Sequence, residues 1–268
     1  MKKQVKCPAS VAAFWTVCML LICSASFAWA QNPKVLVFSK TTAYHHGSIA
    51  KGIAAVQQLG AENKFDVDTT TDASKFTTEN LKQYAALIFI SPTSPARPTP
   101  VDPFNDDQKD AIKKFIESGK GFVGIHSATD FGYGWPWYGE LVGGYFLGHP
   151  RRNVQEAVIN VVDTKSPMTK GMPEHWKRSD EYYSFRPGSN PKDLHVLLAL
   201  DESTEDYGTM TNIKMGDFHP LAWYHDYDGG RAFYTALGHT DETYLDPLFL
   251  NHLKEGIKYA MGKKYKGK

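Results

Sequence analysis

The first half of the chain alternates between short apolar runs and helical patterns, and this alternation constrains the fold most. Apolar runs rich in β-branched or aromatic residues predict strands at 34–39, 65–69, 86–90 and 121–126. Helical spacing of apolar residues predicts helices from Ile49 to Leu59, around Leu81, and from Ala111 to Ile116. Such alternation indicates an α/β fold with a mainly parallel sheet and helices on both faces. Ligands then bind at the carboxyl ends of the strands.

Local signals predict several element boundaries. Gly60 is expected to end the first helix, and Asn105 with Gln108 resembles a capping box for a later one. The second half is less regular, with expected strands at 157–162, 195–200, 218–224 and 232–236. A last helix is expected from Asp246-Pro247 to about Tyr259. No linker or repeat interrupts the chain, so residues 31–268 are predicted to form one domain.

Residues 1–30 are predicted to be a signal peptide. Lysines at 2, 3 and 6 precede an uncharged stretch whose apolar part runs from Val11 to Cys23, and Ala28-Trp29-Ala30 follows. This apolar part is too short to cross roughly 30 Å of hydrocarbon as a stable helix. An uncleaved anchor is the alternative reading. We expect an exported protein, periplasmic or extracellular, with no stable membrane association after leader cleavage.

Cysteine usage and charge exclude several function classes. All three cysteines, Cys7, Cys18 and Cys23, lie in the predicted leader. The mature domain therefore has no thiol nucleophile, no disulfide and no thiolate metal ligand. A formal net charge of +1 argues against a nucleic-acid partner. The many aromatic residues suit a sugar-binding surface or a well-packed layer of loops.

Candidate functional residues gather where the predicted strands end. They are Tyr44, His46, His126, Asp130, His149, Glu181, Tyr182, His219, Trp223 and His239. His126 closes a glycine-containing strand, where α/β enzymes place a nucleophile, and a histidine there serves as acid, base or metal ligand. Ser127 stands one place late for a G-x-S-x-G elbow, which does not fit a serine hydrolase. Four other histidines, at 175, 195, 225 and 252, are expected to be structural.

In these motifs the chain resembles the ThuA-like family, named for bacterial trehalose utilisation, over essentially the whole mature sequence. The matching segments are 38–46, 119–130, 148–150, 180–183, 219–223 and 229–239. The resemblance implies a flavodoxin-like three-layer fold of the class I glutamine amidotransferase type. It places His126 where glutaminases of that superfamily keep their cysteine, so the amidotransferase reaction is lost. It also implies a sugar substrate such as trehalose or a 3-keto derivative, although the leader departs from cytoplasmic family members.

Three functional hypotheses follow. The first is a lyase, hydrolase or isomerase acting on a glycoside or 3-keto-sugar by acid–base chemistry of His126, Asp130, Glu181 and His239. Tyr44, His46, His149, Tyr182, His219 and Trp223 would bind the small-molecule carbohydrate. The second adds a divalent metal such as Zn²⁺, held by histidines 46, 126, 149, 219 and 239 with the acids, although no close-spaced ligand signature is present. The third is a non-catalytic sugar-binding module that stacks sugars on Tyr44, Trp135, Trp137, Tyr182, Tyr183 and Trp223.

Overall fold

The computed structural model describes residues 32–189 and 193–263, together with Met1 and Gln4. Apart from those two residues, the predicted leader lies outside the described residues. Contacts within the chain divide it into Met1–Gln31 and a compact unit from Asn32 to Lys268. In the part that the structure describes, no helix combines the length and the apolar character needed to cross a membrane.

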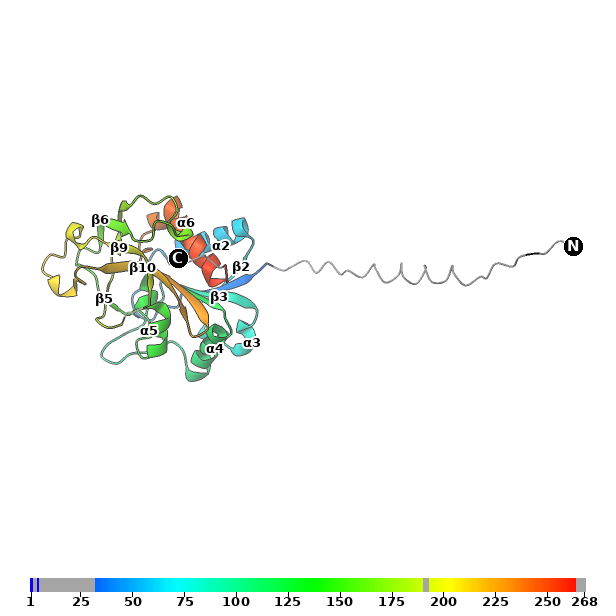
Figure 1. The fold of residues 1–268 in the computed structure, drawn as a ribbon. Helices are drawn as coiled ribbons and strands as arrows, with labels where there is room; N and C mark the ends of the chain where they lie inside the picture. The colour runs from blue at the N-terminus through cyan, green and yellow to red at the C-terminus, as the bar shows by residue number, and fades with distance from the viewer. Residues whose placement is uncertain (2–3, 5–31, 190–192, 264–268) are drawn as a thin grey trace. The chain divides into compact units, whose positions relative to one another are not determined.

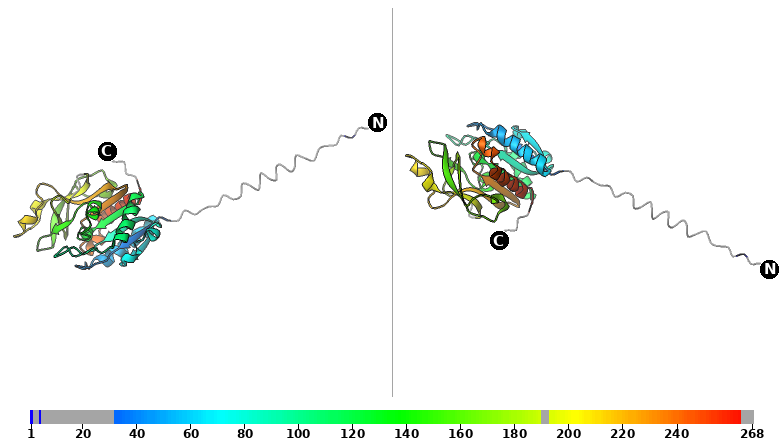
Figure 2. Two further views of the ribbon diagram at one scale, coloured as in Figure 1. Left: turned by 90° about the horizontal axis from the view of Figure 1, so that it is seen from below. Right: turned by 90° about the horizontal axis from the view of Figure 1, so that it is seen from above.

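Nine strands of the described residues form one large sheet, in the order β2-β1-β3-β4-β11-β10-β9-β6-β7. Its strands are β1 (Lys34–Phe38), β2 (Asp66–Thr70), β3 (Tyr84–Ile90), β4 (Gly121–Ile125), β6 (Val154–Val161), β7 (His175–Glu181), β9 (His195–Leu200), β10 (His219–Tyr227) and β11 (Gly230–Thr235). A separate ribbon pairs β5 (Phe146–Gly148) with β8 (Ser184–Phe185). Both views in Figure 2 place the early, blue strands at one end and the yellow segment after β9 at the other.

The prediction of a mainly parallel sheet is wrong. The pairings from β2 through β1, β3 and β4 to β11 are parallel. Those from β11 to β7 are antiparallel, as is the ribbon, so antiparallel pairings are the majority. One of these antiparallel pairs, β10 with β11, has the short connection that antiparallel neighbours allow. Asp228 and Gly229 join β10 to β11 with φ of 48° and 84°, the positive values that a two-residue hairpin turn requires.

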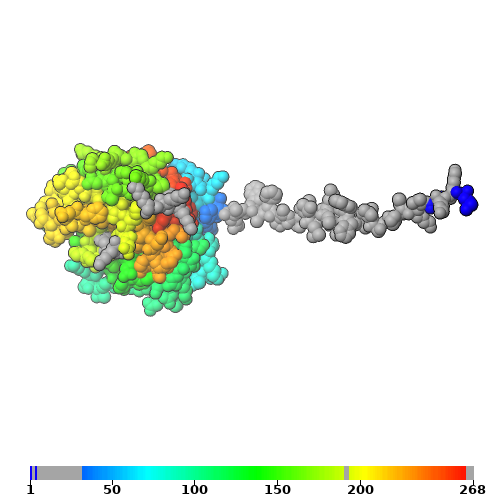
Figure 3. Space-filling view, viewed as in Figure 1, coloured from blue at the N-terminus to red at the C-terminus, as the bar shows by residue number. Residues whose placement is uncertain are grey.

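Helices cover both faces of the sheet, giving the expected three layers. They are α2 (Ile49–Asn63), α3 (Thr78–Leu81), α4 (Asp106–Glu117), α5 (Pro136–Val142) and α6 (Pro247–Ala260). Short 3₁₀ helices occupy Ala73–Lys75, His126–Thr129, Pro167–Thr169, Glu202–Thr204, Thr211–Ile213 and Glu242–Leu245. In Figure 1, α2 and α6 lie on one side of the sheet and α3, α4 and α5 on the other. In Figure 3 the red surface of α6 adjoins the cyan surface of α2.

Helix boundaries test the local signals directly. The Asn105–Gln108 capping box is confirmed, as is the start of α6, where the Asp246 side chain accepts a hydrogen bond from the Leu248 amide. The prediction that Gly60 ends α2 is wrong, because the helix continues to Asn63 and Lys64 takes the left-handed position at φ 60°. Gly60 instead permits close packing, since a Cβ there would lie 2.6 Å from the Phe65 carbonyl oxygen.

A cluster of phenylalanines anchors the loop that carries part of the candidate site. The Phe38 ring contacts the rings of Phe76, Phe89, Phe104 and Phe131, with centroids 4.9–6.2 Å apart. All five are buried, and each aromatic pair contributes about 0.5–1.5 kcal/mol beyond its burial. Phe131 follows the 3₁₀ turn after β4, so this packing holds the neighbouring backbone against the sheet.

Candidate functional site

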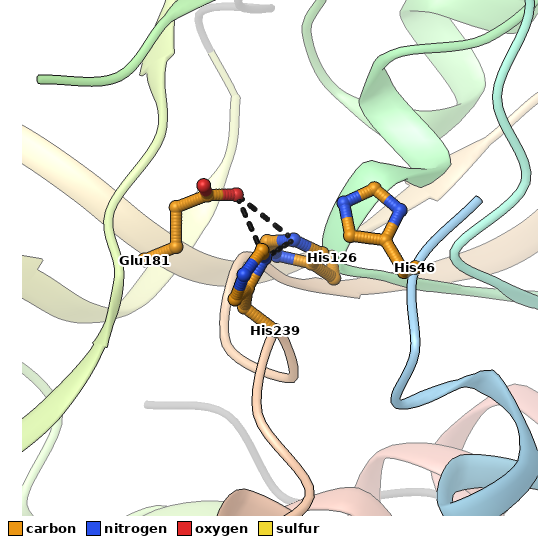
Figure 4. A group of neighbouring side chains, drawn as sticks. All are labelled: His46, His126, Glu181 and His239. Atoms are coloured by element: carbon orange, nitrogen blue, oxygen red, sulfur yellow. Dashed lines mark hydrogen bonds and ion pairs between the residues drawn. The ribbon is translucent and has the colours of Figure 1, made fainter. Parts of the chain in front are cut away.

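Three histidines and one glutamate from distant parts of the chain meet at the carboxyl ends of the parallel strands. His46 follows β1, His126 follows β4, and His239 follows β11. Glu181 is the last residue of β7. Figure 4 shows the four side chains pointing toward one another from these elements. The strand-end rule therefore locates the histidines, and an antiparallel edge strand supplies the carboxylate.

His126 forms the base of this cluster. It is fully buried, and its backbone takes a left-handed conformation at φ 51°, which is strained for a residue with a Cβ. Its Nδ1 lies 2.8 Å from the Ala236 carbonyl oxygen. Because a carbonyl only accepts, Nδ1 must donate there, and in neutral His126 the lone pair of Nε2 faces the cluster.

Three polar atoms of the cluster form a nearly equilateral triangle. His126 Nε2 lies 3.2 Å from Glu181 Oε2 and 3.2 Å from His239 Nδ1. His239 Nδ1 lies 3.0 Å from the same Glu181 oxygen. The His46 ring lies edge-on to that of His126, with centroids 4.7 Å apart. One ligand atom from each of the four residues lies within 4.8 Å of the others, so these residues could hold a metal ion.

The residues of the cluster shift one another's pKa values in opposite directions. Burial opposes ionisation of Glu181, but its close contacts with the His126 and His239 rings outweigh burial and hold the pKa of the carboxyl well below its usual range. Burial lowers the pKa of His239, and Glu181 reverses this so that the net shift is upward. Burial, with the charges of His126 and His239, lowers the pKa of His46 to about 3.

A cavity of about 210 Å³ opens over the cluster. Its lining consists of Tyr44, His46, Asp130, Phe146, His149, Asn153, Glu181, Tyr183 and His239. It is smaller than the roughly 300–1,000 Å³ typical of pockets for drug-sized ligands, and therefore suits a small molecule such as a single sugar ring.

Besides Glu181, the cavity wall carries a second carboxyl group, that of Asp130. Burial raises its pKa to about 6, against the lowering effects of the Tyr133 hydrogen bond and of His126, Arg186 and His149. The Tyr133 hydroxyl donates to Asp130 Oδ1. The pKa of Asp130 therefore lies close to neutral pH, where a carboxyl group exchanges protons readily.

The structure brings most of the predicted site residues to one place. Tyr44, His46, Asp130, His149, Glu181 and His239 line the cavity, and His126 lies beneath it. The lining also includes Phe146 and Asn153, which the sequence analysis missed. Phe146 lies inside the glycine-rich segment that ends at His149, so its place in the sequence could have suggested that it lines the site. Nothing in the sequence around Asn153 suggested this.

Three residues predicted to bind substrate do not line the cavity. Trp223 is buried and donates from Nε1 to the Val142 carbonyl. Tyr182 is buried and donates to the Arg178 carbonyl, while its neighbour Tyr183 faces the cavity. His219 Nδ1 contacts Glu202, and its Nε2 contacts the Tyr183 carbonyl, so it supports Tyr183 from behind. Trp135 and Trp137, the remaining stacking candidates, pack on each other instead.

Comparison with known proteins identifies the family. The model of the ThuA family, described as trehalose utilisation, matches residues 34–260. The chain belongs to the ThuA family. The resemblance seen in the sequence is thus confirmed, and membership implies a class I glutamine amidotransferase-like fold and suggests a carbohydrate-related role. Among curated proteins, none matches this ThuA-family sequence.

Solved structures agree with this assignment. A ThuA-like protein from Bacteroides uniformis is 26% identical, with a TM-score of 0.69 over 91% of this chain and 97% of that one. A ThuA-like protein from Parabacteroides merdae is 20% identical, with a TM-score of 0.63 over 88% of this chain and 92% of that one. A β-galactosidase from Bacillus circulans sp. alkalophilus shares the fold over 31% of its length, with a TM-score of 0.53 and 14% identity.

Proposed function

We propose that this ThuA-family protein is an exported enzyme that processes a carbohydrate, either a glycoside or a 3-keto-sugar, by acid–base chemistry without a thiol nucleophile. One observation carries the proposal. A cavity of single-ring size has the histidine–glutamate cluster at its base and a separate carboxyl group, Asp130, on its wall. The predicted leader supports export, and the absence of cysteine after Cys23 excludes a thiol nucleophile.

The lining suits a sugar because it combines aromatic faces with polar groups. Tyr44 and Phe146 supply rings on which the apolar face of a sugar can pack, and the buried Tyr183 ring supports Phe146 from the wall of the cavity. Asn153 and His149 supply hydrogen-bonding groups for hydroxyls. A few polar groups within a concave site of this kind fix the orientation of a ligand.

Asp130 is the residue to which we assign proton transfer. It faces the cavity, whereas His126 is fully buried beneath it and acts through the cluster. A 3-keto group acidifies the C–H bond next to it. Asp130 would accept that proton, and the electron pair would become an enolate whose oxygen lies against the cluster. When the carbonyl re-forms, the electron pair makes a C=C bond and the bond to the glycosidic oxygen breaks. The leaving oxygen then takes up the proton held by Asp130, which restores the carboxylate.

A product screen tests the proposal. The mature protein, beginning at Gln31, would be incubated with glucosides and their 3-keto forms, and the products identified by mass spectrometry. We expect new products that disappear in Asp130→Asn and persist in His195→Ala, whose histidine is exposed and pairs with Asp163. Binding of a saccharide without any change to it would contradict the proposal and favour the sugar-binding module.

Export needs its own test. Cell fractionation with N-terminal sequencing would be applied to the full-length chain. We expect the mature protein outside the cytoplasm with Gln31 as its first residue. Intact chain retained in the cytoplasm would contradict export.

A further inference from the structure

The contacts of His126 contain an electrostatic conflict. Because Nδ1 donates to the Ala236 carbonyl, neutral His126 directs the lone pair of Nε2 at Glu181 Oε2, 3.2 Å away. His239 Nδ1 lies equally close to that lone pair, and it can donate its single hydrogen to only one of the two atoms. Two buried acceptors face each other, so a positive charge must lie between them.

A proton resolves this conflict less well than a metal ion does. A proton bridges one pair of atoms, yet three atoms lie 3.0–3.2 Å from one another. Tetrahedral ligands at bond lengths of about 2.0–2.2 Å are separated by about 3.3–3.6 Å, slightly more than the sides of this triangle. His46 adds a fourth nitrogen within 4.8 Å of the other ligand atoms.

We infer that His46, His126, Glu181 and His239 bind a divalent metal ion, with Zn²⁺ as the best match. The donor set contains imidazole nitrogens and a carboxylate oxygen, which suit zinc and related first-row ions. Of the five histidines in the metal hypothesis made from the sequence, His149 and His219 drop out. The other three remain, with Glu181 as the acidic ligand.

The surroundings of the four residues are those of a metal site. Metal-bound histidines usually donate their other ring hydrogen to a carbonyl or carboxylate, as His126 does to Ala236. The backbone amide of His239 donates to the buried carboxylate of Asp180, which orients its loop. The cavity borders His46, Glu181 and His239, so a small molecule could approach the ion from that side as a fifth ligand, a coordination number that zinc reaches in catalytic sites.

The metal site also narrows the class of substrate. This part of the inference rests on the proposed function. A sugar oxygen bound beside the cluster would be polarised by the ion, while the proton released from the sugar passes to Asp130. The substrate class narrows to sugars that present a carbonyl next to a hydroxyl, because two neighbouring oxygens can chelate one ion.

Metal binding is tested on mature protein purified without an affinity tag. Its metal content would be measured as isolated, and chelator-stripped protein would then be titrated with Zn²⁺ and Mn²⁺ by calorimetry. We expect about one ion per chain and a rise in the melting temperature on binding. Loss of residues that orient ligands costs about 10–100-fold in affinity, so His126→Ala and Glu181→Gln should each cost more than about 100-fold. His195→Gln should bind as the wild type does.

Two further results separate this inference from the proposed function. Sugar turnover that persists in metal-free protein would remove the ion from the reaction and leave the proposed enzyme intact, whereas stripped protein that takes up neither Zn²⁺ nor Mn²⁺ would overturn the metal site. Protein that binds the metal but leaves every sugar unchanged would support the metal site and contradict the proposed enzyme. If the ligand variants fail to fold, nitrogen NMR of the wild-type histidine rings supplies the answer, since Zn²⁺ should shift His126 Nε2. Unshifted ring nitrogens at saturating Zn²⁺ would refute the inference.

Discussion

Asp180 is the buried carboxylate that holds the His239 loop in place, and Asp180→Asn is the most informative single change. Its Oδ1 accepts from the backbone amides of Glu181 at 2.9 Å and His239 at 3.1 Å. Its Oδ2 accepts from the Gly238 amide at 3.2 Å, from the Thr243 hydroxyl at 2.8 Å and from Arg178 at 3.4 Å. The side chain of Asp180 is fully buried.

The loss of stability expected for Asp180→Asn follows from these donors. Whichever way the new amide turns, its NH₂ group faces two N–H donors, so the variant loses at least two charge-assisted hydrogen bonds. It also leaves the charge of Arg178, whose side chain is only 8% exposed, without its buried partner. Removing one member of a buried pair costs about 3–5 kcal/mol. That is a large part of the roughly 5–15 kcal/mol by which folded domains are stable.

Urea unfolding of wild type and Asp180→Asn measures this loss, and the Zn²⁺ titration measures its effect on the site. We expect the free energy of unfolding to fall by about 3–5 kcal/mol and metal affinity to fall by about 10–100-fold. Asp246→Asn is the matched control. That residue contacts the same arginine at 3.3 Å, is 27% exposed and caps α6, a role that asparagine fills equally well. It should cost less than about 1 kcal/mol. Equal losses in the two variants would refute the reasoning.

Three further predictions concern proton transfer, acid stability and packing. If Asp130 is the base, turnover should rise as pH increases through about 6, where its carboxyl ionises, and Asp130→Asn should lower kcat by about 10²–10⁴-fold; a pH-independent rate between 5 and 7 would contradict this. Burial lowers the pKa of His252 to about 4, so the unfolded chain binds the extra proton and stability falls as pH drops below about 6.5. Between pH 8 and 5 the loss should be about 2 kcal/mol by urea unfolding, and smaller in His252→Leu. Gly121→Ala would place a Cβ 2.0 Å from the Ala260 carbonyl oxygen and should cost about 1–3 kcal/mol, whereas Gly47→Ala, with open space around it, should be nearly neutral in the same assay.

The sequence predicts elements well where the signal is local. The Asn105–Gln108 capping box and the Asp246-Pro247 helix start depend on residues within four positions of each other, and both are confirmed. The Asp228-Gly229 hairpin was equally readable, and it would have predicted the antiparallel pairing of β10 with β11. Strand β7 was missed because Arg178, which is half-buried, and Asp180, which is buried, stand where the alternation calls for apolar residues; the two pair with each other.

By itself the sequence determined the family, the absence of cysteine after Cys23 and the position of His126 and His239 next to predicted strands, since each of these depends on residue type and local order. Only the tertiary structure decided that Glu181 reaches these histidines and that Tyr183, and not Tyr182, faces the cavity. The physical reason is that adjacent residues point in different directions, so a side chain's orientation depends on pairings with distant segments. The lone pair that His126 presents to the site is likewise set by Ala236, a residue 110 positions away.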